Sequence, residues 1–285
     1  MSVQLVASSK LETGAVPLAT TGSLVFAELG ADKPYAYAYE PPEGVPRARG
    51  DYRPHTVELR NARPEAESLS LDVQGFALVR QPSAVRDFWD EAQTLALGHP
   101  EAAELVKTVT GAARVVVFDH TLRRRADGVQ DRTAGLPRQP AMRVHVDQTV
   151  VSGPQRVRDI LGEAAEPLLA RRAAIINVWR PIRHVARDWP LAVADARSVR
   201  PQDLIASDLI FPHRRGEIYL LAHHSGQQWR YVPDLGTDEA ILIKCWDSDP
   251  EVARFAPHTA FEDPATPAGT PPRESIEFRT IAFFD

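Results

Sequence analysis

The apolar residues of this chain fall into short runs that are separated by turn residues. Turn signals are dense, with 24 prolines spread along the sequence, and proline removes a backbone donor that regular pairing needs. This texture is typical of many strands joined by loops. The expected strands lie at residues 23–29, 36–40, 55–60, 76–80, 114–118, 143–149, 173–179, 217–222, 229–233, 239–246 and 274–284.

Helical patterns are fewer. Residues 83–98 begin at Ser83, a residue type favoured at helix N-caps, and repeat apolar residues at helical spacing. Residues 100–111 continue this pattern after a break. A second helical region covers residues 153–172, and we expect Pro167 to interrupt it.

These patterns predict a β-rich α+β fold. The strands of the second half fit a double-stranded β-helix, the jelly-roll or cupin-like core, with flanking helices. We expect a single domain over residues 1–285, in which residues 1–110 support a core of residues 111–285 that holds the site. The proline-rich segment 263–274 is the clearest loop. A Rossmann-type fold lacks its fingerprint, because no G-x-G turn follows a strand.

Composition narrows the function classes. The chain is 44% apolar, has a net charge of −5 and contains one cysteine, Cys245. One thiol allows neither a disulfide framework nor a zinc site of several thiolates, and it suits a reducing compartment. Residues 1–18 lack the pattern of a signal peptide, so we expect a cytoplasmic protein without membrane spans. The densest basic cluster, Arg123–Arg125, is interpreted as a solvated turn, and nucleic-acid binding is not expected.

The segment 143–149 carries an imidazole and a carboxylate two positions apart. On a strand, His145 and Asp147 point to one face and Val144 and Val146 to the other. Such a pair supplies two ligands of the 2-His-1-carboxylate triad, which holds Fe(II) and leaves coordination positions open. A strand with a polar outer face would show the same pattern, so a metal site needs a second histidine from elsewhere.

Five histidines downstream of this pair differ in their surroundings. His184 and His213 lie in polar connections. His223 and His224 end a strand-like run and could line the mouth of a barrel. His258 lies among apolar residues just before the proline-rich loop. We favour His258 as the metal ligand and keep His224 as the alternative.

Polar residues alternate along the strand after this loop, from Arg273 and Ser275 to Arg279. Arginine inside a barrel is costly unless it meets an anion. Its fork of donors matches a carboxylate, to which a nearby hydroxyl can add a hydrogen bond. We therefore predict that His258 binds metal and that Arg273 with Ser275 binds the carboxylate of a small diacid that chelates it. In the alternative, Arg273 is solvated by the loop and Arg279 pairs with Glu277 or another acid at a sheet edge.

The order H-x-D, a long gap, H, then R-x-S resembles the Fe(II)/2-oxoglutarate-dependent dioxygenases. Several blocks are similar to the family that includes the cephamycin 7α-hydroxylation component, the fungal gibberellin desaturase and a fungal meroterpenoid endoperoxidase. These blocks are VHVDQT (144–149), IINVWRP (175–181), WPLAVADARSV (189–199), EAILIKCWDSD (239–249), HTAF (258–261) and RESIEFR (273–279).

The resemblance implies an enzyme with a jelly-roll core that uses Fe(II), 2-oxoglutarate and O2. It makes His145, Asp147 and His258 the iron ligands, and Arg273 with Ser275 the partners of the distal 2-oxoglutarate carboxylate. The implied reaction is hydroxylation or desaturation of a small organic molecule in secondary metabolism. The sequence is also compatible with a homodimer.

The segment 175–181 raises a question of orientation. Asn177 lies on one strand face and Arg180 on the other, and the strand period does not decide which face points inward. Asn177 could donate to the co-substrate, and Arg180 could anchor a carboxylate. In the alternative, Arg180 pairs with an acid such as Asp195 or Asp203.

Two other function classes compete with the oxygenase. An S-adenosylmethionine-dependent methyltransferase would need a cofactor-binding turn, and the glycine-rich form of that turn is missing from this sequence. A non-redox cupin-like protein would bind a metal or another ligand without turnover. Formation of succinate from 2-oxoglutarate separates the oxygenase from both.

Overall fold

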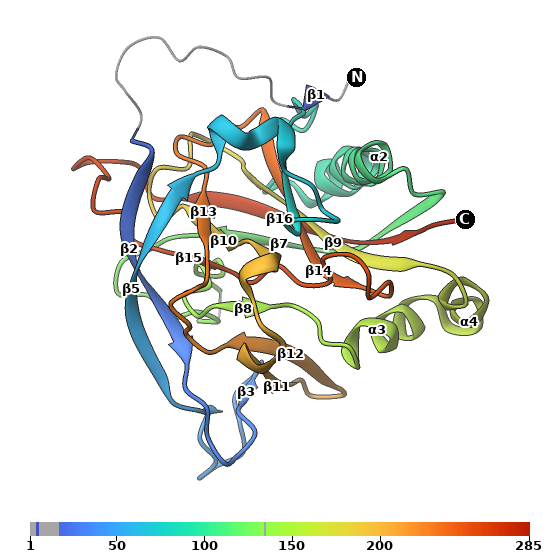
Figure 1. Cartoon of the computed structure of the whole chain (residues 1–285), viewed down its shortest axis with the longest axis horizontal. Coiled ribbons are helices and arrows are strands. Elements are labelled where there is room, and N and C mark those ends of the chain that lie inside the picture. The colour runs from blue at the N-terminus through green and yellow to red at the C-terminus, as the bar shows by residue number, and fades with distance from the viewer. Residues whose placement is uncertain (1–3, 6–16, 134) are drawn as a thin grey trace.

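The computed structural model describes residues 4–5, 17–133 and 135–285. Most of the N-terminal segment that lacks a signal-peptide pattern lies outside these ranges. The described chain is rich in strands, which form two large curled sheets with few helices (Figure 1). The predicted β-rich jelly-roll fold is confirmed. None of the helices in the described ranges is long and apolar enough to cross a membrane.

The six-stranded sheet, sheet A, takes three strands from each half of the chain. Its neighbouring strands pair antiparallel. In spatial order the strands are β1 (Gln4–Leu5), β6 (Phe76–Arg80), β14 (Glu239–Asp247), β9 (Ala173–Pro181), β16 (Glu274–Phe283) and β7 (Arg114–Arg124).

The ten-stranded sheet, sheet B, faces sheet A and includes two parallel pairs, β13 with β5 and β11 with β3. In spatial order its strands are β2 (Ala19–Ala27), β5 (Tyr52–Asn61), β13 (Trp229–Tyr231), β10 (Leu191–Ala194), β15 (His258–Ala260), β8 (His145–Val146), β12 (Arg215–Leu221), β11 (Leu204–Ile210), β3 (Tyr35–Tyr37) and β4 (Ala48–Arg49). The sequence patterns did not predict β4, β10, β11 or β15 of this sheet.

The helices are short and lie outside the sheets. They are α1 (Glu91–Gln93), α2 (His99–Thr110), α3 (Ser152–Leu161) and α4 (Ala165–Leu169). The first helix does not begin at Ser83, whose hydroxyl donates to Glu101. It begins after Asp90, whose carboxylate accepts the N–H groups of Ala92 and Gln93 and so caps the helix.

The second helical region breaks at a different residue from the predicted one. Helix α3 ends at Leu161. The next residue, Gly162, has a positive φ of 55°, which glycine adopts without steric cost. Pro167 lies in the first turn of α4. Proline is tolerated there because the first N–H groups of a helix have no partner within the helix.

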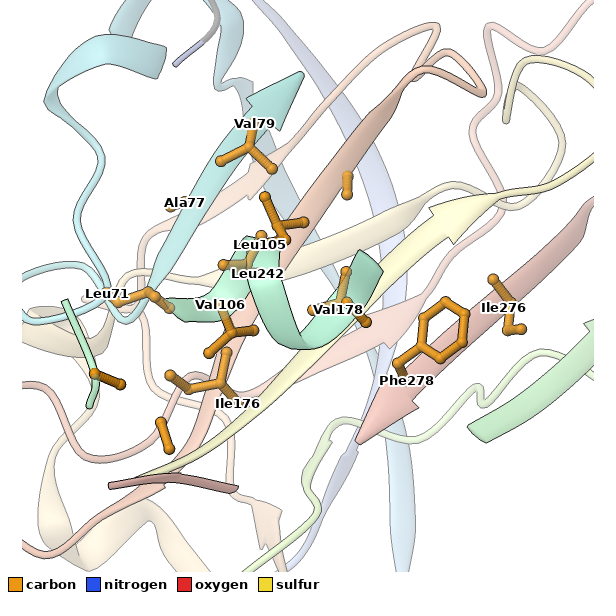
Figure 2. Packing of buried hydrophobic residues seen from close by; sticks show 14 of the residues in the cluster. Leu71, Ala77, Val79, Leu105, Val106, Ile176, Val178, Leu242, Ile276 and Phe278 are labelled. Carbon is orange, nitrogen blue, oxygen red and sulfur yellow. The ribbon is translucent and has the colours of Figure 1, made fainter. Parts of the chain in front are cut away.

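Helix α2 covers the outer face of sheet A. Figure 2 shows its Leu105 and Val106 against Ile176 and Val178 of β9, within one continuous apolar cluster. Each such side chain contributes roughly 1.5–3 kcal/mol when it is fully buried. The cluster takes the even-numbered residues of β9, so the odd-numbered ones point toward sheet B.

The inner faces of the two sheets form a second apolar cluster. Trp179 of β9 and Ile241 of β14 pack there against Leu191 and Val193 of sheet B. The same inward direction is shared by Asn177 on β9, whose side chain reaches Asp147. The space between the sheets therefore holds both apolar packing and the polar residues of the site.

Candidate metal centre

Two short strands of sheet B bring two histidines and an aspartate together. His145 lies on β8 and is the direct cross-strand partner of His258 on β15. Their ring centroids are 4.6 Å apart. One potential ligand atom from each of His145, Asp147 and His258 lies within 4.8 Å of the other two. The structure thus assembles the three residues that were predicted to bind metal.

The backbone orients both imidazoles. His145 Nδ1 lies 2.8 Å from the carbonyl oxygen of Arg143, and His258 Nδ1 lies 3.1 Å from that of Ala256. A protonated Nδ1 that donates to a carbonyl leaves a lone pair on Nε2, as in metal-binding histidines. His258 Nε2 is buried and has no hydrogen-bond partner among the described residues. A metal ion would give this atom the partner that it lacks.

Burial keeps one of these rings neutral. Burial, and then repulsion from His258, lowers the pKa of His145 to about 4. Metal binding requires the neutral imidazole. The ligand form of His145 is therefore present at neutral pH without any cost of deprotonation.

Asp147 is held through one of its two carboxylate oxygens. Its Oδ2 accepts hydrogen bonds from Asn177 Nδ2 at 2.8 Å and from Arg279 Nε at 3.2 Å. Its Oδ1 lies 3.5 Å from His145 Nε2. Burial raises the pKa of Asp147, but Arg279 and then the two imidazoles lower it by more, so the net pKa lies well below its usual range. One oxygen of an ionised carboxylate is left for a metal.

Arg279 connects this carboxylate to sheet A. Its Nη2 donates to Glu277 Oε1 at 2.6 Å, so the predicted pairing of these two residues exists. Its Nη1 donates to Thr121 Oγ1 at 2.8 Å and to Asp119 Oδ2 at 3.1 Å. Strand β16 is not at a sheet edge, because β9 and β7 flank it. The contact with Asp147 makes Arg279 part of the metal centre, which the sequence patterns left open.

Arg273 and Ser275 lie just before and at the start of β16. Arg273 is 2% exposed, and its Nη1 donates to the carbonyl oxygen of Trp189 at 2.6 Å. Its guanidinium also lies over the ring of Trp179, 5.3 Å from the centroid. Arg273 Nε and Ser275 Oγ are buried without a partner in the described part of the chain. Both atoms are available to an anionic ligand.

The strained backbone at Trp189 places its carbonyl oxygen where Arg273 can donate to it. Its φ is 45°, which non-glycine residues rarely adopt. Such a conformation costs on the order of 1–3 kcal/mol and persists only where surrounding contacts fix it. Here the carbonyl of Trp189 accepts from Arg273, and the neighbouring Asp188 accepts the backbone N–H of Arg273. The guanidinium is therefore held in place before any ligand arrives.

Two further candidates are not brought into this cluster. Arg180 lies on the opposite face of β9 from Asn177, and its Nη2 donates to the carbonyl oxygens of Gln81 and Thr237, both at 2.7 Å. His224 accepts the N–H of Gly226 in the turn after β12. Neither belongs to the metal-binding group of the described residues.

The suggested acid partners of Arg180 are also engaged elsewhere. Asp195 pairs with Arg197, and Asp203 pairs with Arg200. Nη2 of Arg180 donates to backbone carbonyls instead, and its Nε is buried without a partner among the described residues. Burial lowers the pKa of Arg180 to about 10. Its position on the face of β9 opposite Asn177 directs the guanidinium away from the metal centre.

The donor set fits Fe(II). Two neutral imidazoles and one carboxylate form the set found in non-haem iron oxygenases that keep open coordination positions. Softer metals that prefer thiolates are disfavoured, because the one cysteine, Cys245, is not in the group. The hydrogen bonds to Nδ1 of both histidines and to Asp147 Oδ2 supply the outer support that such ligands usually have.

The side chain of Asn177 donates to Asp147 and so supports a metal ligand, whereas the sequence suggested that it could donate to the co-substrate. Replacing Asn177 with Ala should weaken Fe(II) binding by roughly 10- to 100-fold, the usual effect of losing a group that supports a ligand. Anaerobic titration of the metal-free protein with Fe(II) measures this. Asn61→Ala is the control, since Asn61 is also buried and hydrogen-bonded but lies on β5. Equal Fe(II) affinity in the Asn177→Ala protein and the parent would contradict the assigned role.

Comparison with known proteins places these residues in context. A family model described as "Oxidoreductase/YMDC permease-like domain" matches residues 24–283. The Fe(II)/2-oxoglutarate-dependent dioxygenase nvfI of Aspergillus novofumigatus is 31% identical over 263 residues, which cover 90% of this chain and 93% of that protein. The hydroxylase/desaturase CTB9 of Cercospora beticola is 34% identical over 261 residues, which cover 83% of this chain and 79% of that protein.

A solved structure agrees with these relatives. The iron and alpha-ketoglutarate-dependent endoperoxidase NvfI superimposes on this chain with a TM-score of 0.85 and 30% sequence identity. The match covers 94% of this chain and 99% of that one. Sequence and fold therefore agree over nearly the whole length of both proteins.

Proposed function

Because this chain belongs to the Fe(II)/2-oxoglutarate-dependent dioxygenases, we propose that His145, Asp147 and His258 hold its iron. The enzyme uses Fe(II), 2-oxoglutarate and O2, and it acts on a small organic molecule. The observation that carries the assignment is the group of three ligand atoms within 4.8 Å, in which His258 Nε2 is buried without a partner.

Arg273 and Ser275 hold the distal carboxylate of 2-oxoglutarate in this proposal. Their buried free donors face no protein acceptor among the described residues, and the planar guanidinium matches a carboxylate. When bound, iron with 2-oxoglutarate supplies the activation of dioxygen that is coupled to loss of carbon dioxide and formation of succinate. The chain's own part is to bind, to orient and to exclude water.

Each supporting residue has a defined part in that task. Asn177 and Arg279 hold Asp147 Oδ2 and so keep Oδ1 directed toward the metal. The backbone carbonyls at Nδ1 keep Nε2 of both histidines free of protons. Trp179, beneath the guanidinium of Arg273, adds an aromatic face that stabilises the cation.

We propose hydroxylation or desaturation of the substrate, in secondary metabolism. Support comes from the relatives whose names are hydroxylase/desaturase. Methyl transfer and metal binding without turnover, the competing functions, gain no support from any of these relatives. The cytoplasmic location and the homodimer remain predictions from the sequence.

An anaerobic absorption spectrum tests the proposal. Fe(II) and 2-oxoglutarate added to the parent should give the metal-to-ligand charge-transfer band of the chelate. Arg273→Gln should weaken 2-oxoglutarate binding by at least about 30-fold, as expected when a buried charged partner is truncated, and the band should disappear at a concentration that saturates the parent. Fe(II) binding itself should persist, since Arg273 is not a ligand.

Arg180→Gln is the matched control, because Arg180 is equally buried but lies on the other face of β9. It should lose stability and keep the band. A parent protein that forms neither the band nor succinate would refute the proposed function. A band retained at full strength in Arg273→Gln would refute the assignment of the anchor alone.

A further inference from the structure

A second arginine points into the same end of the site. Along β7, Leu122 packs against the outer apolar cluster, and Arg124 pairs with Glu274 and lies over the ring of Trp89. Arg123 lies between them in sequence and so points to the opposite, inner face. Its cross-strand partner on β16 is Ser275.

Thr121, two positions before Arg123 on β7, supports the inward direction of Arg123. The side chain of Thr121 also points inward, because its hydroxyl accepts a hydrogen bond from Arg279, which in turn contacts Asp147. Arg123 therefore continues the row of inner residues away from the metal ligands. Side chains of direct cross-strand partners lie about 4.5–5.5 Å apart at Cβ, so Arg123 and Ser275 are close neighbours.

Arg123 has few partners of its own. Among the described residues, its guanidinium makes one hydrogen bond, from Nη1 to the carbonyl oxygen of Gln139 at 2.7 Å. Within the described ranges, no carboxylate lies within 4.0 Å of its guanidinium or of that of Arg273. Glu277, two positions after Ser275 on the same strand face, is bonded to Arg279, and Asp188 accepts the backbone N–H of Arg273 and not its guanidinium. Arg273 and Arg123 are thus two cations without a direct counter-ion.

This arrangement is unfavourable without an anion. Burial, and then repulsion from Arg123, lowers the pKa of Arg273 to about 9. Burial likewise lowers the pKa of Arg123. Enclosed guanidinium groups are stabilised when a carboxylate or phosphate accepts from both. The free hydroxyl of Ser275 lies beside them and adds a further donor.

We propose that Arg123 is a second guanidinium for the distal carboxylate of 2-oxoglutarate, beside Arg273 and Ser275, and that it makes the enzyme select its co-substrate by that negative charge. This inference rests on the proposed function. It adds a co-substrate-binding residue that lies far in sequence from the R-x-S segment. Arg123 and Arg273 would together select a co-substrate with a negatively charged distal group.

The test compares two co-substrates in the iron-loaded enzyme. 2-Oxopentanoate has the chain length of 2-oxoglutarate but carries a methyl group in place of the distal carboxylate. Dissociation constants for both are measured anaerobically from the charge-transfer band. Arg123→Gln should weaken 2-oxoglutarate binding by about 10- to 100-fold, the loss expected for a charge-assisted hydrogen bond. Binding of 2-oxopentanoate should stay the same or tighten, because repulsion between the guanidiniums is relieved.

Arg124→Gln is the matched control, since Arg124 is adjacent in sequence and points to the outer face; both dissociation constants should be unchanged. Arg123→Lys keeps the charge and should lose less affinity for 2-oxoglutarate than Arg123→Gln does. If Arg123→Gln is too unstable to assay, Arg123→Met replaces it, and a preference between the two co-substrates equal to that of the parent overturns the proposal.

Other results separate this inference from the proposed function. If Arg123→Gln binds 2-oxoglutarate as tightly as the parent, the inference is wrong while the function stands. The same holds if only the KM for the organic substrate rises, which would assign Arg123 to a substrate carboxylate. Equal weakening of both co-substrates would mean general damage to the site and would also overturn it. Absence of 2-oxoglutarate binding by the parent would refute the proposed function itself.

Discussion

Replacing His145 with alanine is expected to abolish succinate formation and to weaken Fe(II) binding by more than about 100-fold. Loss of a supporting group alone costs roughly 10- to 100-fold in metal affinity, and here a ligand itself is removed. Two donors, Asp147 and His258, remain within reach of one another. Iron content after anaerobic desalting and succinate released per protein measure the effect.

His224→Ala is the control for this experiment, because His224 is the alternative ligand that the sequence allowed. It lies in the turn after β12 and contacts Gly226, so its removal should leave iron content and succinate formation unchanged. Stoichiometric Fe(II) in the His145→Ala protein would rule out the ligand assignment. Loss of iron from His224→Ala would make His224 a ligand after all.

Replacing Arg279 with glutamine should cause the largest loss of stability of any single change in the site, about 3–5 kcal/mol in the free energy of unfolding. Arg279 contacts three carboxylates, those of Asp147, Glu277 and Asp119. The side chains of Asp147 and Glu277 are only 16% and 8% exposed, and removing the cation leaves their charges enclosed together. Urea unfolding of metal-free protein measures the loss without a contribution from iron.

Asp119→Asn tests whether enclosure is the cause. The side chain of Asp119 is 55% exposed, and exposed ion pairs are worth less than about 1 kcal/mol. This variant should therefore unfold at nearly the same urea concentration as the parent. If Arg279→Gln proves as stable as Asp119→Asn, then water screens the cluster far more than its burial indicates, and Arg279 does not hold it together.

The local part of the site could be predicted from the sequence because it depends only on strand alternation. Alternation predicted a shared face for His145 and Asp147. The structure assembles both with His258, although β8 ends at Val146 and Asp147 follows it. The partner histidine is harder to predict. Strand β15 has only three residues, too few to show a period, so His258 stood out through its apolar neighbours and the family-like blocks.

Orientation within a fully buried strand could not be predicted. Every residue of β9 is buried, and such strands show no alternation between polar and apolar residues. Both Asn177 and Arg180 were therefore candidates, one on each face. The packing of α2 decides the matter, because it occupies the face of β9 that carries Val178 and Arg180.

The interpretation of the cluster Arg123–Arg125 as a solvated turn failed for a different reason. Three consecutive arginines suggested a solvated turn. Counting charges along the sequence does not distinguish residues that lie on opposite faces of a strand. Strand β7 extends to Arg124 and separates them, with Arg124 outward beside Trp89 and Arg123 inward opposite Ser275. Only the length of this strand, longer than the predicted 114–118, reveals the difference.

The position of β16 between β7 and β9 has a consequence for how the protein is made. Both neighbouring strands leave the ribosome long before β16 does, yet neither can pair with the other, since β16 lies between them. Such non-local pairing is slow to form and leaves strand edges exposed meanwhile. Residues 274–283 thus complete the sheet and deliver Ser275 and Arg279 in the same step. A nascent chain would acquire the arginine that supports Asp147 and the completed central sheet together, after translation of these residues.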